Sequence, residues 1–266
     1  MSADIRQKAY ITDKTELAPD IISMVLKVKL CRAALPGQFV LVYTGDGARL
    51  LGRPLCIADA DGDTVRIVFR RVGEGTARIA ESRVGDTLFV EGPLGNGYPV
   101  EGILEGGHSI ALLGGGLGAP SLLYLARHLS AGRGERECRA FLGYKDSTLK
   151  HFLADEFERL GMDTIISTDD GSEGTKGNVL DALKGTGKKP DLIYACGPLP
   201  MLSAVRKYAG DNDIKAYISL EEHMACGVGV CLGCVVKTVH KDEHSRVNNA
   251  RVCTEGPVFD AKEVDI

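Results

Sequence analysis

The sequence predicts a multidomain protein with an antiparallel β-barrel, then an α/β domain with a parallel sheet, then a small cysteine-rich C-terminal segment. Three observations predict this order. Short alternating strands fill about the first hundred residues, strands and helices alternate after Gly107, and half of the eight cysteines lie beyond Glu221. We therefore expect units at residues 1–103, 104–220 and 221–266.

Composition limits the classes of function. The chain has 266 residues, 44% of them hydrophobic and 26% charged, as expected of a globular protein. Its net charge is −4 and its lysines and arginines are scattered, so we expect no nucleic-acid partner.

The N-terminus has no apolar run typical of a secretory signal, so we expect the protein in the cytosol, where disulfides are unlikely. The uncharged run at residues 109–126 contains four glycines and a proline. These residues break a membrane-spanning helix and favour a strand, a turn and a helix, so we expect no membrane span.

Four segments predict the barrel. Residues 22–30 alternate apolar and polar side chains, which indicates a half-buried strand. Further strands are expected at residues 37–44, 64–72 and 85–92, separated by glycine and aspartate turns.

Alternating elements predict the α/β domain. Strands are expected at residues 109–115, 138–145, 163–170, 191–197 and 215–222, and helices at residues 120–129, 151–160, 178–185 and 200–210. In such a fold, ligands bind at the carboxyl ends of the strands. The 46 residues from Glu221 onward are too few for a core of their own, so we expect something other than packing to hold them.

The C-terminal cysteines predict an iron-sulfur site. Cys226, Cys231 and Cys234 have the C-x4-C-x2-C spacing of plant-type clusters, and Cys253 supplies the fourth thiolate. Glycines between them permit tight turns with positive φ and bring backbone N–H groups near the sulfurs. These glycines are Gly227, Gly229 and Gly233.

Structural zinc is the main alternative, but zinc sites usually contain two C-x2-C pairs and this segment has one. Three nearby histidines could replace a thiolate: His223, His240 and His244. The remaining cysteines are dispersed: Cys31, Cys56, Cys138 and Cys196. Of these, Cys138 is interpreted as a small core residue.

The barrel carries two weak signals for a diphosphate. Arg53 in the stretch RPLC offers a planar fork of donors, and Gly75 and Thr76 in GEGT offer backbone N–H and hydroxyl donors. A surface arginine and an ordinary turn are the structural alternatives.

A glycine loop predicts nucleotide binding. Gly114, Gly116 and Ala119 satisfy G-x-G-x-x-G/A between a strand and a helix, and Gly115 and Gly118 complete the loop. A second turn, Cys196–Gly197–Pro198, ends a later strand.

The local residues leave the choice between NADH and NADPH open. Glu135 and Glu137 precede the next strand, and Asp146 follows a lysine. Asp169 and Asp170 could contact a ribose or form a solvated turn.

The order of these motifs resembles the ferredoxin-reductase family of flavoenzymes over about residues 5–220. The resemblance implies that the barrel holds FAD and that the parallel-sheet domain receives a nicotinamide nucleotide. It implies flavin contacts from two sets of residues: Arg53, Pro54, Leu55 and Cys56, then Val68, Phe69, Arg70, Gly75 and Thr76. Serine is usual where this chain has Cys56, and a thiol is a weaker donor. The Cys196 turn would lie where nicotinamide meets flavin, or Cys196 simply packs beneath it.

The run SLEEHMACGVGVCLGCVVK, with VCTEGPVF, is similar to the electron transfer subunits of class B dihydroorotate dehydrogenase. That likeness implies FAD and a two-iron, two-sulfur cluster on Cys226, Cys231, Cys234 and Cys253, in pyrimidine biosynthesis. It implies a separate FMN subunit that oxidises dihydroorotate, with two copies of each subunit, and electrons that pass through cluster and FAD to NAD⁺. No catalytic acid–base residue is expected, because the cofactors carry the chemistry.

Two other functions fit the same motifs. One is an NAD(P)H-dependent flavin and iron-sulfur reductase subunit of another system, such as a sulfide dehydrogenase or a ferredoxin:NADP reductase. The other is a non-catalytic nucleotide-binding module with structural zinc.

Overall fold

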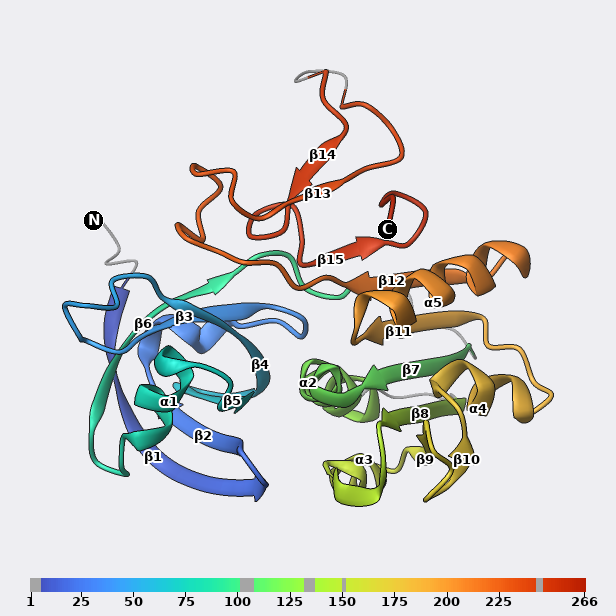
Figure 1. The fold of residues 1–266 in the computed structure, drawn as a ribbon, viewed down its shortest axis with the longest axis horizontal. Helices are drawn as coiled ribbons and strands as arrows, with labels where there is room; N and C mark the ends of the chain where they lie inside the picture. Colours follow the sequence, from blue (N-terminus) through green and yellow to red (C-terminus); the bar gives the residue numbers. More distant parts are fainter. Residues whose placement is uncertain (1–5, 101–107, 132–136, 150–151, 243–245) are drawn as a thin grey trace.

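The computed structural model describes residues 6–100, 108–131, 137–149, 152–242 and 246–266. Figure 1 shows the barrel beside the α/β unit, with the C-terminal segment lying across the top of both. This arrangement agrees with the predicted fold class. The first predicted domain boundary falls within residues 101–107, outside the described residues, and the set of boundaries stays a prediction.

Six strands form a closed antiparallel barrel in the order β1-β2-β5-β4-β3-β6. They are β1 (Arg6–Ala18), β2 (Ile21–Lys27), β3 (Phe39–Tyr43), β4 (Arg53–Asp61), β5 (Thr64–Arg70) and β6 (Thr87–Leu94). Alternate residues of these strands fill the barrel, as the period of a strand requires. Its interior is entirely apolar around Met24, Val40 and Ile67, each 0% exposed.

The barrel corrects three details of the sequence interpretation. The strand expected at residues 22–30 ends at Lys27, and a 3-10 helix, η1 (Lys29–Ala33), follows. The stretch RPLC, outside the four strands expected from the sequence, begins strand β4. A helix that the sequence analysis missed, α1 (Glu74–Glu81), begins within the GEGT motif.

Seven strands form the second sheet, in the order β10-β9-β8-β7-β11-β12-β15. They are β7 (Ser109–Gly115), β8 (Glu137–Tyr144), β9 (Asp163–Thr168), β10 (Thr175–Lys176), β11 (Leu192–Cys196), β12 (Lys215–Ser219) and β15 (Val258–Asp260). The strand order reverses between β7 and β11, which are parallel neighbours. Ligands bind at such switch points in doubly wound sheets.

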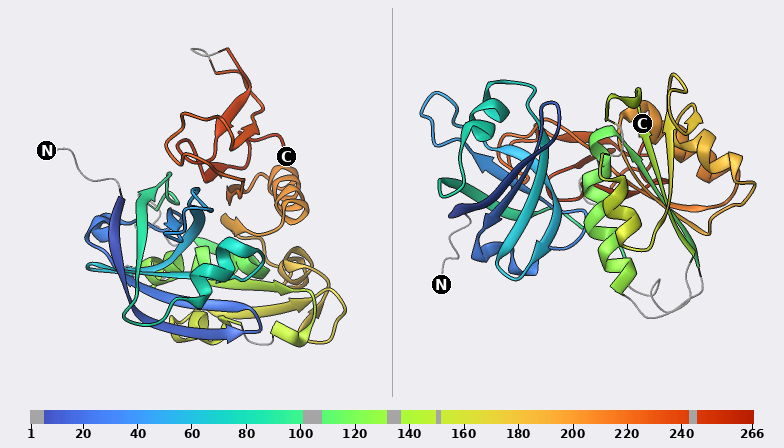
Figure 2. Two further views of the ribbon diagram at one scale, coloured as in Figure 1. Left: turned by 60° about the vertical axis from the view of Figure 1, so that its left-hand side comes forward. Right: turned by 90° about the horizontal axis from the view of Figure 1, so that it is seen from below.

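Helices cover both faces of this sheet (Figure 2). They are α2 (Ala119–Ala131), α3 (Ala154–Arg159), α4 (Val179–Gly185) and α5 (Leu199–Asp211), with the short 3-10 helices η2 (Gly116–Gly118) before α2 and η3 (Ser147–Leu149) after β8. The apolar residues of α2 and α3 share one cluster and those of α4 and α5 share another. Strands β7 and β11 are buried on both faces, which explains their continuous apolar runs. The predicted strand, turn and helix at residues 109–126 are confirmed.

The C-terminal segment is held partly by packing, contrary to the sequence expectation. Strand β15 pairs antiparallel with β12 at the edge of the large sheet. A hairpin of β13 (Val235–Lys237) and β14 (Asn249–Arg251) rises from it. Cys234, Cys253 and Phe259 lie in the same apolar cluster as α5. The segment is therefore an extension of the neighbouring core.

Polar contacts fix the three units together. Arg66 of the barrel forms a bidentate ion pair with Glu156 of α3. Asn96, after β6, donates its backbone N–H to the carbonyl oxygen of Gly256 at 2.6 Å. Its side-chain amide donates to the carbonyl oxygens of Thr254, at 3.3 Å, and Glu255, at 3.0 Å. Within the described ranges, no helix is long and apolar enough to span a membrane.

Replacing Asn96 by aspartate should loosen the C-terminal segment. The carboxylate cannot donate to the Thr254 and Glu255 carbonyls, and its charge would face their oxygens. Loss of about 1 kcal/mol should lower the melting temperature by about 2–4 °C. Asn178→Asp is the matched control, because its oxygen accepts from the Leu180 N–H and aspartate caps a helix equally well. Equal melting temperatures for the two variants would contradict the role given to Asn96.

Candidate functional site

The glycine loop and the Cys196 turn meet at the switch point of the sheet. A Cβ added to Gly118 would lie 2.1 Å from the Cys196 carbonyl oxygen and 2.6 Å from the Gly197 nitrogen. A Cβ on Gly115 would lie 2.9 Å from the Pro198 ring. Only glycine allows this approach, because the obstructing groups are largely backbone. The structure therefore brings the two predicted nucleotide motifs together at one edge.

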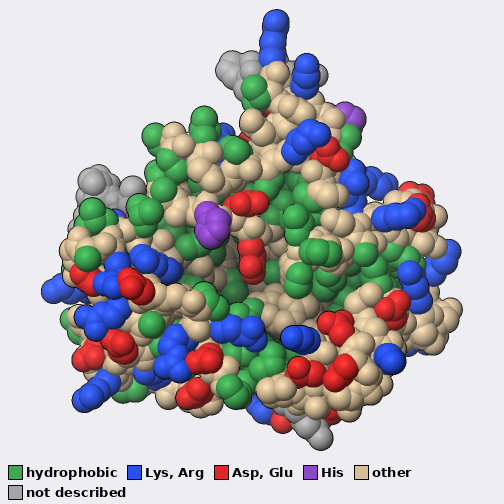
Figure 3. Space-filling view, viewed as in Figure 1, with side chains coloured by type: hydrophobic (Ala, Val, Ile, Leu, Met, Phe, Trp, Pro, Cys, Tyr) green, Lys and Arg blue, Asp and Glu red, His purple; other side chains and the backbone are tan. Residues whose placement is uncertain are grey.

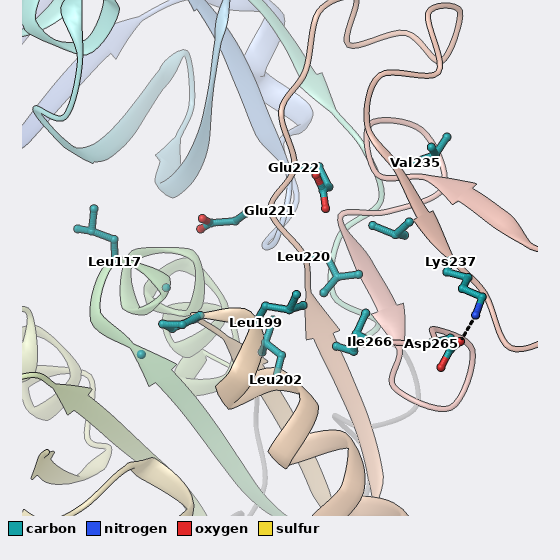
Figure 4. A pocket seen from close by; sticks show the side chains of 15 residues that line it. Leu117, Leu199, Leu202, Leu220, Glu221, Glu222, Val235, Lys237, Asp265 and Ile266 are labelled. Atoms are coloured by element: carbon teal, nitrogen blue, oxygen red, sulfur yellow. Dashed lines mark ion pairs between the residues drawn. The ribbon is translucent and has the colours of Figure 1, made fainter.

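A cavity of about 520 Å³ opens beside this junction. One wall is the α/β unit and the other is the C-terminal segment, including Val235, Lys237 and Asp265. Figure 3 shows this face hollowed between the three units, with acidic side chains around the hollow. In Figure 4, Glu221 points across the gap toward Leu117, and Lys237 pairs with Asp265 on the far side.

A cluster of titratable groups lies where the barrel meets this cleft. Burial raises the pKa of Cys56, and the charges of Cys196 and Glu221 raise it further. Burial raises the pKa of Cys196 to about 12, and Glu221 adds to the shift. Burial also raises the pKa of Tyr98, again with a contribution from Cys196. Cys56, of the barrel, and Cys196, of the sheet, are therefore neighbours, and both thiols stay protonated near neutral pH.

Glu221 is the acid of this cluster. Its side chain borders the cavity and meets water there, yet the surrounding protein raises the pKa of its carboxyl by burial. Glu221 carries no signal in the sequence, because a glutamate after a strand is an ordinary pattern. Only its position beside Cys56 and Cys196 distinguishes it.

The Arg53 side chain lies directly over Gly75, the second glycine of GEGT. A Cβ on Gly75 would come within 1.9 Å of the Arg53 Nε atom and 2.3 Å of its Cζ atom. The Thr76 hydroxyl accepts hydrogen bonds from the N–H groups of Val72, at 3.0 Å, and Gly73, at 3.2 Å. The guanidinium and the first turn of α1 thus form a cationic cradle that glycine keeps open.

The second predicted flavin segment is split by the period of its strand. Phe69 is buried inside the barrel, whereas Val68 faces the α/β unit. The Phe69 ring therefore cannot contact a ligand outside the barrel. Leu55 also belongs to the barrel interior, while Pro54 and Arg70 are half-buried. The contacts predicted for these residues stay predictions, and only backbone contacts remain open to Phe69 and Leu55.

The four C-terminal cysteines form two pairs. The Cys231 N–H points to the Cys226 sulfur at 3.5 Å, and the Gly233 N–H to the Cys231 sulfur at 3.4 Å. Cys234 and Cys253 lie in the same apolar cluster, and the Val252 N–H, beside Cys253, donates to the Cys234 carbonyl oxygen at 2.9 Å. The first pair is accessible to solvent, whereas the second is buried: Cys234 is 2% exposed and Cys253 is 1% exposed. Among the described residues, no three histidine, cysteine or carboxylate side chains converge on a single metal position.

Tight turns carry the first pair. Gly227 and Gly229 have φ values of 69° and 79°, as their predicted role requires. Gly233 does not have positive φ, and Leu232 takes that conformation instead, with φ of 56°. A Cβ on Gly227 would lie 2.6 Å from Leu41 of the barrel, so this loop packs against strand β3. His244 falls outside the described residues.

Two acidic turns lie on one side of the glycine loop. Asp146 accepts from the Thr148 N–H at 2.8 Å, and Asp170 accepts from the Ser172 N–H at 2.9 Å. These turns follow β8 and β9 at the carboxyl edge of the sheet. Glu137 begins β8 at the opposite edge, so it cannot serve a ligand held by the glycine loop. Glu135 lies outside the described residues.

Comparison with known proteins identifies close relatives. A profile of the iron-sulfur cluster binding domain of dihydroorotate dehydrogenase B matches residues 221–265. The electron transfer subunit of dihydroorotate dehydrogenase B (NAD(+)) of Lysinibacillus sphaericus is 38% identical over 257 residues, covering 96% of each chain. The corresponding subunit of Fusobacterium nucleatum is 40% identical over 266 residues, covering 96% of this chain and 97% of its own.

Solved structures share the fold. An NADH-dependent reduced ferredoxin-NADP oxidoreductase, studied for flavin-based electron bifurcation, matches with a TM-score of 0.83 and 27% identity. The match covers 100% of this chain and 91% of that one. A ferredoxin NADP⁺ reductase from Neisseria gonorrhoeae with bound FAD and NADP covers 79% of this chain and 92% of its own, with a TM-score of 0.67 and 15% identity. The second likeness shows the fold alone.

Replacing Gly118 by alanine should separate the glycine loop from the Cys196 turn. Backbone atoms of Cys196 and Gly197 occupy the position of the new Cβ, so the chain must shift. We expect a lower melting temperature and about tenfold weaker NADH binding, measured by fluorescence titration. Gly210→Ala in helix α5 is the control, because nothing lies within 4 Å and alanine favours helix. Unchanged NADH affinity in Gly118→Ala would show that the contact between the glycine loop and the Cys196 turn is not part of the nucleotide site.

Proposed function

Because this chain belongs to the family of electron transfer subunits of NAD-dependent dihydroorotate dehydrogenase B, we propose that it connects an FMN-containing catalytic subunit to NAD⁺ through a two-iron, two-sulfur cluster and FAD. One observation carries the proposal. The cysteine pairs, the cationic cradle of the barrel and the switch-point cleft lie on three units that share one junction. Each has the chemistry of one step of that route.

The barrel fits FAD. The Arg53 guanidinium and the N-terminal turn of α1 would bind the diphosphate, since both offer N–H donors and positive charge. Cys56 faces the junction with Cys196 and Glu221, where the flavin ring would lie. A protonated thiol there is a weak donor, and Glu221 provides a group that can hold a proton beside it.

The cysteine geometry supports a cluster with two irons. Zinc sites usually contain two C-x2-C-type pairs, whereas here Cys226 lies with Cys231 and Cys234 lies with Cys253, in a C-x4-C-x2-C spacing with a distant fourth cysteine. Two irons, each held by two thiolates, match this division. The backbone N–H groups of Cys231 and Gly233 would stabilise the negative charge of the sulfurs.

The switch-point cleft fits the nicotinamide nucleotide. The glycine loop lets a diphosphate approach the backbone at the start of α2, where the helix dipole favours an anion. The Cys196–Gly197–Pro198 turn and Glu221 would face the nicotinamide end. Two ends of one ligand would then span the α/β unit and the barrel.

When bound, the cluster would supply one-electron transfer and FAD would supply the two-electron chemistry that hydride transfer to NAD⁺ requires. The residues of the chain bind and position. The loop around Gly227 packs on Leu41 and Leu94 of the barrel, which brings the cysteine pairs toward the flavin site. This packing would hold a cluster bound by the cysteines near a flavin bound by the barrel.

The exposed face of the cysteine loop is suited to a partner. Val228, Val230 and Leu232 are 43%, 79% and 60% exposed, and they surround the solvent-accessible Cys231. Such an apolar group around a redox site is typical of an interaction surface. We propose that the FMN subunit docks here, with two copies of each subunit in the complex.

A second function has a specific observation in its favour. The bifurcating ferredoxin-NADP oxidoreductase matches the whole chain with a TM-score of 0.83. A reductase subunit that serves ferredoxin would use the same three sites. Activity with ferredoxin, and none with dihydroorotate in the presence of the FMN subunit, would favour this alternative.

Replacing Cys231 by alanine tests the proposed route. The variant should lose iron and acid-labile sulfide and, in complex with the FMN subunit, dihydroorotate-dependent NAD⁺ reduction. It should keep NADH oxidation by an artificial acceptor, because that reaction needs FAD and not the cluster. Cys138→Ala, in strand β8 away from the cysteine pairs, should keep both activities. Normal iron content in Cys231→Ala would contradict the ligand assignment.

Replacing Gly75 by alanine should weaken FAD binding. The new methyl group would displace the Arg53 guanidinium from its place over the turn. Loss of charge-assisted hydrogen bonds should weaken FAD affinity by about tenfold, measured as flavin retained after dialysis. Gly73→Ala is the matched control, since nothing lies within 4 Å of its Cβ position and its φ of −155° suits any residue. Equal flavin content in both variants would contradict the assignment of Arg53 to the FAD site.

A further inference from the structure

Arg251 links the two cysteine pairs. It ends β14, two residues before Cys253, and its carbonyl oxygen accepts from the Thr254 and Glu255 N–H groups at 3.2 and 2.8 Å. Its Nη1 atom reaches across to the carbonyl oxygen of Gly229 at 3.4 Å. The same residue therefore contacts the turn after the buried pair through its backbone and the loop that carries the accessible pair through its side chain.

Glu255 holds this arginine in place. One carboxylate oxygen of Glu255 accepts from the Arg251 backbone N–H at 2.8 Å and from its Nε atom at 2.6 Å. Strand pairing sets Arg251 opposite Val235, the residue after Cys234, and the Val252 N–H donates to the Cys234 carbonyl oxygen at 2.9 Å. Arg251 therefore lies beside the segment that carries the buried cysteine pair.

We propose that Arg251 sets the reduction potential of the cluster and that Glu255 limits its effect. The proposal rests on the cluster function argued above. One-electron reduction adds a negative charge at the cysteine pairs, and the guanidinium stabilises that charge. The carboxylate opposes it. The two residues also brace the loop, so charge and geometry must be tested separately.

Four variants separate the two roles. Arg251→Gln should lower the potential and Glu255→Gln should raise it, while the double variant should return close to wild type. Arg251→Lys keeps the charge and should keep the potential. Because both side chains are partly exposed, 41% and 44%, solvent and salt weaken the effect. We expect about a threefold change in the one-electron equilibrium, which is about 28 mV at 59 mV per tenfold.

The measurement is a redox titration of the purified flavoprotein, followed by electron paramagnetic resonance of the reduced cluster. The shifts should shrink at high ionic strength, as electrostatic shifts do. Lys207→Gln and Asp211→Asn are matched controls. They remove the same charges from an ion pair of the same spacing, 2.7 Å long and exposed on α5, and should leave the potential unchanged.

Opposite shifts for Arg251→Gln and Glu255→Gln would support the proposal. Shifts in the same direction, or none in either, would overturn it and leave Arg251 as a brace only. If Arg251→Gln loses its cluster, the test rests on the cluster potential of Glu255→Gln. An unchanged or lower potential in that variant would overturn the proposal. Wild-type protein without iron would instead contradict the proposed function, so the two failures are distinguishable.

Discussion

The antiparallel pairing of β15 with β12 is the contact on which the arrangement of the sites depends. The C-terminal segment has too few residues for its own core, so its strand β15 pairs with the edge of the large sheet and its apolar residues join the core there. Ser219 pairs with Val258, which fixes the turn after Cys253 beside the strand that leads to Glu221. On its other side the same turn bonds to Asn96 of the barrel. One short segment thus sets the position of the buried cysteines relative to both larger units.

The cysteines show how environment divides one residue type into several roles. Burial without polar partners raises the pKa of Cys31 to about 12, so it behaves as a small apolar residue. Cys196 is buried as well, but it lies beside Glu221 at the cleft. Backbone N–H groups around Cys226 outweigh its burial and lower its pKa to about 6. Surroundings that favour the thiolate agree with the ligand role proposed for Cys226, a role that is not proposed for Cys31 or Cys196.

The sequence was most informative where local pattern and tertiary role agree. The buried parallel strands, their helices and the glycine loop were predicted because apolar runs, turns and spacing are local properties. Helix α1 was missed because Gly75 and Thr76, both poor helix formers, lie in its first turn and Gly73 precedes it. Strand β15 was missed because three residues carry no period, and its partner lies about forty residues away. Glu221 and Arg251 could not be found at all, since only the neighbours supplied by the fold make them distinctive.

The glycines of this chain explain why so few reactive side chains are needed. A Cβ on Gly118 would strike the backbone of the Cys196 turn, one on Gly75 would strike the Arg53 side chain, and one on Gly227 would strike strand β3 of the barrel. Gly118 lets the glycine loop contact the backbone of the Cys196 turn, and Gly75 lets the Arg53 guanidinium lie against helix α1. Gly227 lets the cysteine loop pack against strand β3. When cofactors carry the chemistry, close approach is what the protein must provide. Adding a methyl group at these points would therefore impair function as surely as removing a ligand, although none of the three residues has a side chain to react.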